Sequence, residues 1–237
     1  YPVKKLILFD IDGTLISTKR SAQHAIMEYA CEYAIGYSIP TSAIPPLSGK
    51  TDKQIIREIL DNLEISQNNS EEITHKFLEG LRVATPKHSS DETINVLTNV
   101  IELVEHLHNL PEFQLALLTG NNRECAYSKL MPTGLNAYFP FGAFGCDHHD
   151  RRKLPPIAIE RANEFVKQSH FSSGNTLIIG DAPGDIACAK ANNIPILAVA
   201  TGLFTVQELE QEGANPVLKS FGDLKASIAE IQTLLSF

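Results

Sequence analysis

The stretch that most constrains the fold is residues 6–15, Leu-Ile-Leu-Phe-Asp-Ile-Asp-Gly-Thr-Leu. Its apolar start, followed by turn-forming residues, predicts a strand that is buried in a sheet. Two carboxylates, Asp10 and Asp12, then follow one residue apart. Like charges held this close repel each other unless a cation lies between them. The sequence therefore predicts that Asp10 and Asp12 belong to a metal-dependent catalytic site.

Short apolar runs alternate with helical patterns through the second half of the chain. Strands are expected at residues 115–118, 176–179 and 196–199, and helices at about 94–107, 123–131, 155–168 and 186–191. All-apolar strands separated by helices are typical of a parallel sheet with helices on both faces. The expected fold class is therefore α/β, with a Rossmann-like core. The near-periodic apolar residues between 209 and 234 predict a segment that covers the sheet.

The residues that follow the first strand have helical patterns only. Apolar spacings of three and four predict helices at about 22–33, 55–63 and 71–83, with a polar turn at 66–70 and a linker at 85–90. No strand is expected among them. We therefore predict an α/β core domain of residues 1–16 and 87–237, with a small all-α domain of residues 17–86 inserted after the first strand.

Charge and cysteine usage narrow the partners and the compartment. The net charge of −8 argues against nucleic acid, because binding there usually depends on a basic surface. No window is apolar and long enough to span a membrane, and the first residues lack a signal-peptide pattern. The cysteines lack CxxC spacing, so we expect reduced thiols in a cytoplasmic protein, without a disulfide framework or a zinc site; they are Cys31, Cys125, Cys146 and Cys188.

Polar side chains follow two further strands at the point where each is expected to end. Thr119, Gly120 and Asn121 follow the strand at 115–118, and Asp181 and Asp185 follow the strand at 176–179. In an open parallel sheet, ligands bind at the carboxyl ends of the strands. Each residue taken alone also suits an ordinary role, as a helix cap, a first-turn acid or a turn residue. Their gathering with the first two aspartates at one edge favours a functional site.

These segments resemble the motifs of the haloacid dehalogenase superfamily, and most closely its phosphatase branch with a small α-helical cap, as in phosphoglycolate phosphatases. Residues 10–14 match the family's DxDGT motif, residues 118–121 its hydroxyl-bearing second motif, and residues 180–185 its GDxxxD metal motif. The motifs occur in the family's order, and the resemblance covers nearly the whole chain.

The resemblance implies an aspartyl-phosphate mechanism with Mg²⁺ as cofactor. Asp10 would be the nucleophile, and Asp12 would protonate the leaving oxygen and then accept a proton from the attacking water. Magnesium suits an all-oxygen site that also holds phosphate. Its ligands would be the Asp10 carboxylate, the Asp12 backbone carbonyl and Asp181, with Asp185 in a supporting or water-mediated role.

The resemblance also implies a phosphate-binding set. Thr119 would donate a hydrogen bond to the phosphoryl group, helped by the backbone amides of Gly120 and Asn121 at the start of the next helix. The family's third motif supplies a cation, usually a lysine before a helix. Here three adjacent cations qualify: we favour Arg151, because Asp-Arg occurs at this place in a subgroup of the family, with Lys153 as the next choice and Arg152 left open.

The histidine pair and the inserted helices both bear on the predicted site. His148 and His149 do not predict a metal centre, because adjacent side chains rarely converge on one ion. The inserted helices fall where related enzymes carry a cap that excludes water from the reaction. Residues 48–52 resemble the cap loop that faces the active site, so Lys50 is a candidate for contacting the anionic or polar part of the substrate.

The leading hypothesis is magnesium-dependent hydrolysis of a small phosphomonoester, such as phosphoglycolate or a sugar phosphate, by a monomer or homodimer. A sugar phosphomutase shares all these motifs. A dehalogenase needs no metal and only the first aspartate, and phosphonate-cleaving relatives usually lack the second. A phospho-accepting signalling domain is about half as long and has no helical insertion, and nothing in the motifs indicates a binding protein that has lost hydrolysis. The expected partner is a small phosphorylated metabolite.

Overall fold

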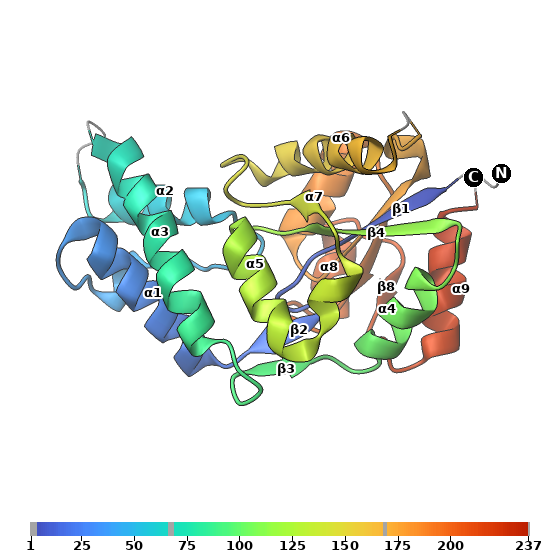
Figure 1. Ribbon diagram of the computed structural model, residues 1–237, viewed down its shortest axis with the longest axis horizontal. Helices are drawn as coiled ribbons and strands as arrows, with labels where there is room; N and C mark the ends of the chain where they lie inside the picture. Colours follow the sequence, from blue (N-terminus) through green and yellow to red (C-terminus); the bar gives the residue numbers. More distant parts are fainter. Residues whose placement is uncertain (1–3, 66–68, 168–169, 237) are drawn as a thin grey trace.

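A sheet of parallel strands carries the edge at which the predicted site residues gather (Figure 1). The computed structural model describes residues 4–65, 69–167 and 170–236. Within them the main sheet has six strands, all paired in parallel, in the spatial order β5 (Gly142–Ala143), β4 (Phe113–Leu118), β1 (Lys5–Phe9), β6 (Thr176–Gly180), β7 (Ile196–Val199) and β8 (Val217–Leu218). The expected α/β fold with a parallel sheet is confirmed.

The register of the central strands sets where the site forms. Phe9, at the end of β1, pairs with Leu117 of β4 on one side and with Ile179 of β6 on the other. The three strands therefore end level with one another. Because parallel strands point the same way, the residues that follow all three leave the sheet at one edge.

Helices cover both faces of the sheet, as the alternation of strands and helices predicted. Ile7 and Phe9 face one hydrophobic core and Leu6 and Leu8 face the other, since successive side chains of a strand point to opposite sides. The first face packs against α4 (Val100–His108), α5 (Arg123–Leu130) and α9 (Leu224–Leu234). The second packs against α6 (Leu154–Val166), α7 (Pro183–Asn192) and α8 (Val206–Gln211). Short 3₁₀ turns are η1 (Thr41–Ala43), η3 (Met131–Thr133), η4 (Leu135–Tyr138), η5 (Arg151–Lys153) and η6 (Ser173–Asn175).

The helical insertion after β1 forms a cap with its own hydrophobic core. It contains α1 (Arg20–Ile35), α2 (Asp52–Asn62) and α3 (Ser70–His88), at the left of Figure 1. Apolar side chains of all three helices pack together, and Cys125 of α5 joins them from the core domain. The expectation of a small all-α insertion is thus confirmed, while the domain limits at residues 16–17 and 86–87 stay a prediction.

A two-stranded ribbon at the base of the cap was not foreseen. β2 (Ile16–Thr18) pairs antiparallel with β3 (Ile94–Val96), so the expectations of no strand within 17–85 and of a helix starting at Ile94 are wrong there. The chain leaves the core domain through β2 and returns through β3, and pairing of the two crossings satisfies their backbone groups. The helix expected over 94–107 begins only at Val100.

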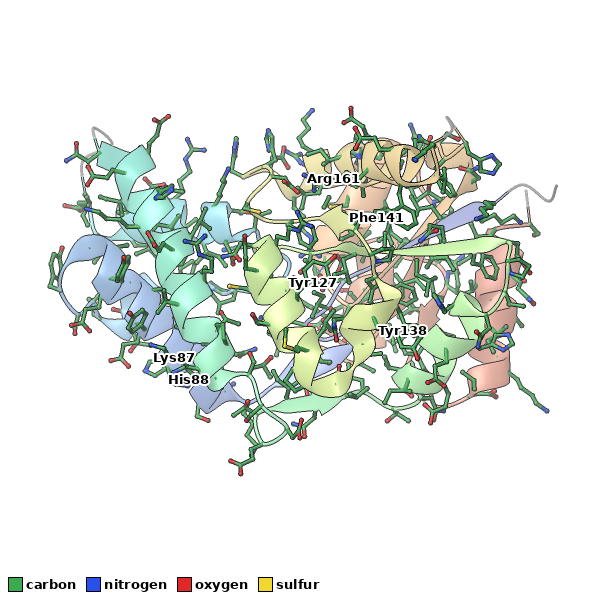
Figure 2. The ribbon with its side chains drawn as sticks, in the orientation of Figure 1. Lys87, His88, Tyr127, Tyr138, Phe141 and Arg161 are labelled. Atoms are coloured by element: carbon green, nitrogen blue, oxygen red, sulfur yellow. The ribbon has the colours of Figure 1, made fainter. Side chains whose placement is uncertain are left out.

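The linker expected at residues 85–90 is also partly wrong, because α3 continues through Lys87 and His88 (Figure 2). Pro86 lies inside the helix, and because it lacks a backbone N–H it removes one hydrogen bond from the last turn. The helix continues because Ala84 and Thr85 are buried against the core domain, and Thr85 Oγ1 donates a hydrogen bond to Cys125 Sγ at 3.1 Å. Packing of the last turn outweighs one missing hydrogen bond.

The remaining expectations hold with small shifts of boundary. Of the expected polar turn at 66–70, residues 66–68 lie outside the described part of the chain, as does Gln168 at the end of the helix expected over 155–168. The closing segment covers the sheet with α8 and α9, and it also adds β8 to the sheet edge. Among the described helices, none has the length and apolar character needed to cross a bilayer.

One close helix contact gives a test of the cap. Gly80 of α3 lies so near α1 that a β-carbon there would be 2.8 Å from the Cα of Ala30. Alanine normally favours a helix over glycine by about 1 kcal/mol. We expect Gly80→Ala to lower the free energy of unfolding instead, by about 1–3 kcal/mol, because backbone must shift to make room. Urea denaturation measures the change.

Gly174→Ala is the matched control. The nearest atom to a β-carbon at Gly174 is Ser172 Oγ at 3.7 Å, so we expect a change within about 0.5 kcal/mol. A Gly80→Ala protein as stable as the wild type would contradict the tight packing of α1 on α3.

Candidate active site

Three buried carboxylates meet at the edge of the sheet where β1 and β6 end. Asp10 directly follows β1, Asp181 directly follows β6, and Asp185 lies in the first turn of α7. Their side chains are 6%, 2% and 0% exposed, and one oxygen from each lies within 4.8 Å of the others. The strand register described above is what brings residues 171 positions apart into one cluster.

The three buried carboxylates carry more negative charge than the nearby positive charge neutralises. Burial raises the pKa of Asp10 to about 7, and the neighbouring carboxylates add to the effect while Arg151 opposes it. Burial, together with the charges of Asp10 and Asp185, raises the pKa of Asp181 to about 9. A divalent cation would relieve this repulsion, and an all-oxygen donor set of this kind suits Mg²⁺ or Ca²⁺ rather than a metal that prefers nitrogen or sulfur.

Arg151 supplies the protein's own positive charge to the cluster. Its Nη2 donates hydrogen bonds to Asp10 Oδ1 at 2.9 Å and to Asp185 Oδ1 at 2.5 Å. Burial disfavours the guanidinium charge, but the carboxylates of Asp185 and Asp10 outweigh it and raise the pKa of Arg151. Its Nε is buried and has no hydrogen-bond partner among the described residues.

The structure separates the three adjacent cations of the third segment. Arg151 is 5% exposed and reaches the carboxylates, whereas Arg152 is exposed and pairs with Asp150 at 2.9 Å. Lys153 is exposed and does not line the cavity at the carboxylates. The geometry therefore places Arg151 at the site and leaves Lys153 away from it, because one turn of 3₁₀ helix points successive side chains in different directions.

Asp185 has two partners that orient it. One oxygen accepts from Arg151, and the other accepts from the backbone N–H of Ala182 at 3.1 Å. The carboxylate thus caps the first turn of α7 as well as holding Arg151, so both the ordinary and the functional interpretation apply to this residue.

Asp12 points away from the three carboxylates and into a separate set of donors. Its Oδ2 accepts hydrogen bonds from Lys129 Nζ at 2.7 Å and from Asn121 Nδ2 at 2.8 Å, and its Oδ1 accepts from Thr18 Oγ1 at 3.1 Å. Burial alone would raise the pKa of Asp12, but Lys129, Asn121 and Thr18 together lower it. The two aspartates one residue apart therefore have opposite electrostatic environments.

Lys129 is the site residue that the sequence analysis missed. It lies on α5, its side chain is 12% exposed, and its ammonium also donates to Asn121 Oδ1 at 2.7 Å. A lysine inside an amphipathic helix normally indicates a solvent-facing side chain. The signal available in the sequence was position: α5 starts directly after the strand-end segment, and Lys129 lies two turns along it, one turn beyond Cys125 on the same side.

The segment after β4 places a hydroxyl and backbone amides at the same edge. Thr119 Oγ1 accepts from Asn121 Nδ2 at 2.9 Å, and its own proton is available for another acceptor. The cap of α5 is neither Thr119 nor Asn121 but Asn122, whose Oδ1 accepts from the N–H of Cys125 at 3.0 Å. Thr119 and Asn121 are thus not needed to cap the helix.

Gly13 is required by the way the first loop passes Asp181. Its φ is +90°, and a β-carbon there would lie 2.2 Å from Asp181 Oδ2. The next residue, Thr14, donates a hydrogen bond to Asp181 Oδ1 at 3.1 Å. The glycine and threonine of the first motif therefore bring the β1 loop against the carboxylate that follows β6.

The cap loop closes directly onto the strand-end segments. The N–H of Asp52 donates to Gly120 O at 2.8 Å, and the N–H of Asn122 donates to Asp52 Oδ2 at 2.6 Å. A β-carbon at Gly120 would lie 1.8 Å from Lys50 O, so only glycine allows this approach. Burial raises the pKa of Asp52 to about 6. Lys50 lines the cavity, and its ammonium pairs with Glu58 of the cap.

Closure of the cap leaves a cavity of about 640 Å³ between the two domains. The strand-end residues of the core domain line one part of it, and α1, α2, α3 and the cap loop line the rest. Core residues in the wall are Asp10, Asp12, Gly13, Thr119, Gly120, Asn121, Cys125, Lys129, Arg151, Asp181, Thr201, Gly202 and Leu203. Thr201, also unforeseen from the sequence, donates from Oγ1 to Gly13 O at 2.6 Å and thereby holds the first loop.

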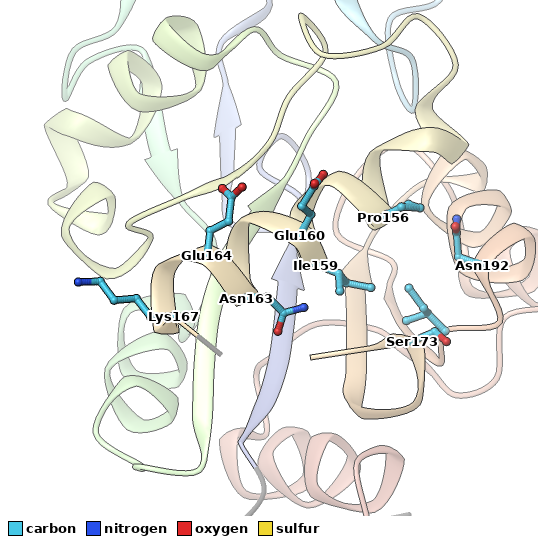
Figure 3. A pocket seen from close by; sticks show the side chains of 9 residues that line it. Pro156, Ile159, Glu160, Asn163, Glu164, Lys167, Ser173 and Asn192 are labelled. Carbon is cyan, nitrogen blue, oxygen red and sulfur yellow. The ribbon is translucent and has the colours of Figure 1, made fainter. Parts of the chain in front are cut away.

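A second hollow, of about 890 Å³, lies on the outer side of α6 (Figure 3). Its charged side chains are Glu160, Glu164 and Lys167. None of the strand-end residues lines it, and its carboxylates are spaced along one exposed helix. The side chains that could carry chemistry therefore line the cavity under the cap and not this hollow.

Comparison with known proteins agrees with this geometry. The family described as haloacid dehalogenase-like hydrolase matches residues 7–199. A phosphoglycolate phosphatase of Vibrio cholerae is 29% identical over 192 residues, covering 78% of this chain and 80% of that protein. The pyrophosphatase PpaX of Oceanobacillus iheyensis is 23% identical over 225 residues, covering 93% of this chain and 94% of that protein. The crystal structure of a β-phosphoglucomutase from Clostridium difficile has a TM-score of 0.69 at 18% identity, covering 98% of this chain and 97% of that one, and so shares its fold.

The raised carboxylate pKa values predict an unusual stability profile. A group whose pKa is higher in the folded than in the unfolded protein stabilises the fold below its unfolded pKa, and that contribution is lost as the pH rises towards the folded value. For Asp181 the window runs from about 4 to about 9. In a chelator we therefore expect the free energy of unfolding to fall between pH 6 and 9, by about 1 kcal/mol per pH unit. Added Mg²⁺ should restore it.

Urea denaturation of the wild type and of Asp181→Asn tests this. The variant should lose most of the slope, be the more stable protein at pH 8 in chelator, and gain little from Mg²⁺. Parallel slopes for the two proteins would mean that Asp181 does not carry the buried charge.

Proposed function

Because the chain belongs to the haloacid dehalogenase-like hydrolase family, we propose that it hydrolyses a small phosphate monoester through an aspartyl-phosphate on Asp10, with Mg²⁺ as cofactor. One observation carries the proposal. A buried carboxylate at the end of the central strand lies beside two further buried carboxylates, and a buried arginine bonds to it and to one of them. This arrangement lets one aspartate approach a phosphoryl group whose charge would otherwise repel it.

Asp10 acts as the nucleophile. One carboxylate oxygen attacks phosphorus, the bond from phosphorus to the ester oxygen breaks, and the electron pair leaves with that oxygen. Arg151 holds the attacking carboxylate through Oδ1, and its positive charge offsets that of the phosphoryl oxygens beside it. From the neighbouring strand end, the hydroxyl of Thr119 donates a hydrogen bond to the same phosphoryl group.

Asp12 moves the protons. In the first step it protonates the departing ester oxygen, and in the second it removes a proton from the water that attacks the aspartyl-phosphate, releasing inorganic phosphate and restoring Asp10. Lys129, Asn121 and Thr18 favour its ionised form, which is the form required for the second step. Delivery of a proton in the first step requires a substrate oxygen to replace some of these donors.

Asp10, Asp181 and the backbone carbonyl of Asp12 would hold Mg²⁺, with Asp185 supporting the site through Arg151 and the α7 amide. The ion would offset the charge of the carboxylates and of the phosphoryl oxygens during transfer. Every donor in the set is an oxygen, as Mg²⁺ prefers.

The substrate is a small molecule, because the cap closes the cavity above the carboxylates. Phosphoglycolate and sugar phosphates are the classes we propose first, on the grounds of the relatives' names and of the helical cap. Lys50 lines the cavity and is a candidate substrate contact, provided that it leaves Glu58 to pair with the substrate.

A phosphomutase would use the same aspartates and the same fold. It would return the phosphoryl group to the sugar, so accumulation of an isomeric sugar phosphate rather than free phosphate distinguishes it.

The nucleophile can be tested directly. We expect the Mg²⁺-loaded protein to release phosphate from members of a panel of phosphorylated metabolites, and Asp10→Asn to reduce kcat/KM by at least about 10³-fold, because an amide oxygen cannot form the acyl phosphate. Acid-quench trapping of labelled phosphate on the protein identifies the intermediate. Phosphate release that is unchanged in Asp10→Asn, or equal in chelator, would refute the mechanism.

The role of Arg151 can be separated from that of its neighbours. Lysine keeps the charge but loses the planar fork, so Arg151→Lys should lower kcat/KM by roughly 10²-fold. Arg152→Lys, one residue along the same turn, should change it less than about twofold, because the exposed side chain of Arg152 pairs with half-buried Asp150 and not with the site carboxylates. Equal losses in the two variants would argue against the assignment of the third-motif cation to Arg151.

A further inference from the structure

The cavity under the cap is larger than the smallest substrates of this chemistry require. Its volume is about 640 Å³, within the range of roughly 300–1,000 Å³ that holds drug-sized ligands. A water molecule occupies about 30 Å³ of liquid, so the space corresponds to roughly twenty waters. A two-carbon phosphate ester such as phosphoglycolate, with about nine heavy atoms, would replace roughly half of them. The remaining space belongs to the cap side of the cavity.

Part of the wall on the cap side is apolar, and the polar side chains in it are Arg20, Gln23, Ser48, Lys50, Asp52 and Thr85. The apolar part is formed by one or two side chains from each cap helix and by the loop before α2, namely Ile26, Met27, Ile55, Leu81, Pro45, Pro46 and Leu47. The first four are 4–6% exposed, whereas Ile56 and Ile59 of α2 are fully buried. The cap's hydrophobic core is therefore open to the cavity at these side chains and closed elsewhere along α2.

The polar groups on the cap side do not suit an anionic leaving group. The ammonium of Lys50 pairs with Glu58, and the hydroxyl of Thr85 donates to Cys125 Sγ. Arg20 lines the cavity only from an exposed position at the start of α1. A carboxylate or second phosphate placed against Ile26, Ile55 and their neighbours would lose its hydration without gaining a buried cation.

We propose that the cap side of the cavity binds an apolar leaving group, so that the preferred substrates are phosphate monoesters of alcohols that carry a hydrocarbon chain or ring. This inference rests on the proposed function and, within small phosphate monoesters, places hydrocarbon esters ahead of phosphoglycolate and sugar phosphates. Water held against an apolar wall is displaced favourably by hydrocarbon. The phosphoryl end then lies at Asp10 and Arg151, and the hydrocarbon end lies against α1, α2 and α3.

A homologous series of esters tests the proposal on the full-length, Mg²⁺-loaded protein. We expect kcat/KM to rise from ethyl to butyl to hexyl phosphate by roughly two- to fourfold per methylene, with phenyl phosphate near the top of the series. Phosphoglycolate and pyrophosphate should fall near ethyl phosphate or below it. A flat series, or a preference for phosphoglycolate or pyrophosphate, overturns the proposal and leaves the phosphatase function intact.

Adjacent isoleucines of α2 provide a matched pair of variants. Ile55→Val removes a methylene group from the cavity wall and should lower the hexyl-to-ethyl ratio of kcat/KM by roughly three- to tenfold. Ile56→Val removes the same group from the closed part of the cap core and should leave the ratio unchanged. If both variants change the ratio equally, the effect comes from cap stability and the proposal fails.

Binding measured without turnover tests the apolar site separately from the proposed hydrolysis. Calorimetric titration with hexylphosphonate and ethylphosphonate, which cannot be hydrolysed, measures the cavity alone. Tighter binding of hexylphosphonate than of ethylphosphonate supports the apolar site if Ile55→Val weakens it and Ile56→Val does not. If that result is obtained but no ester is cleaved, the apolar site stands and only the proposed hydrolysis fails. Equal binding of the two phosphonates to the wild type overturns the apolar site.

Discussion

The main constraint on the structure is the repulsion between the carboxylates that are buried at the end of the central strand. Asp10, Asp181 and Asp185 lie within 4.8 Å of one another with almost no access to water. Each would be costly to bury alone, and the arginine that joins two of them offsets only part of their charge. The fold accepts this cost because β1 and β6 are held from both faces by a continuous hydrophobic core. The excess negative charge is what a divalent cation would offset, in agreement with the metal site that we propose.

The two acids of the first motif have opposite electrostatic environments because their side chains meet different partners. Burial raises the pKa of Asp10 to about 7, with Arg151 opposing the rise and the neighbouring carboxylates adding to it. Asp12 faces Lys129 and its neighbours, which lower its pKa. These different environments suit the different roles that we propose for them, Asp10 as nucleophile and Asp12 as proton carrier. The residue between them, Ile11, is fully buried and anchors the turn.

The cap completes the site by backbone contact rather than by a large side-chain interface. Glycines at the strand ends let the cap loop approach: Gly120 lies against Lys50, and Gly184 against Gly49. Hydrogen bonds from Asp52 hold the same loop in place. The enclosed space is charged on the core side and partly apolar on the cap side, so the two domains contribute different parts of the recognition. In the function that we propose, the core domain carries the reaction and the cap selects what is attached to the phosphate.

Most of the architecture followed from the sequence alone, because buried strands and amphipathic helices have local periodicities that a single chain displays. The apolar runs ending in Asp10 and Asp181 predicted both the sheet and the edge at which those acids meet. What failed was non-local: the β2–β3 ribbon forms only because two crossings between domains lie side by side, and α3 passes Pro86 because its last turn is buried. Likewise, the sequence favoured Arg151, but only the tertiary structure placed it beside the carboxylates with Lys153 away from them, brought Lys129 to Asp12 and shaped the apolar part of the cavity wall. Side-chain direction across separate elements decides such contacts, and no spacing along the chain encodes it.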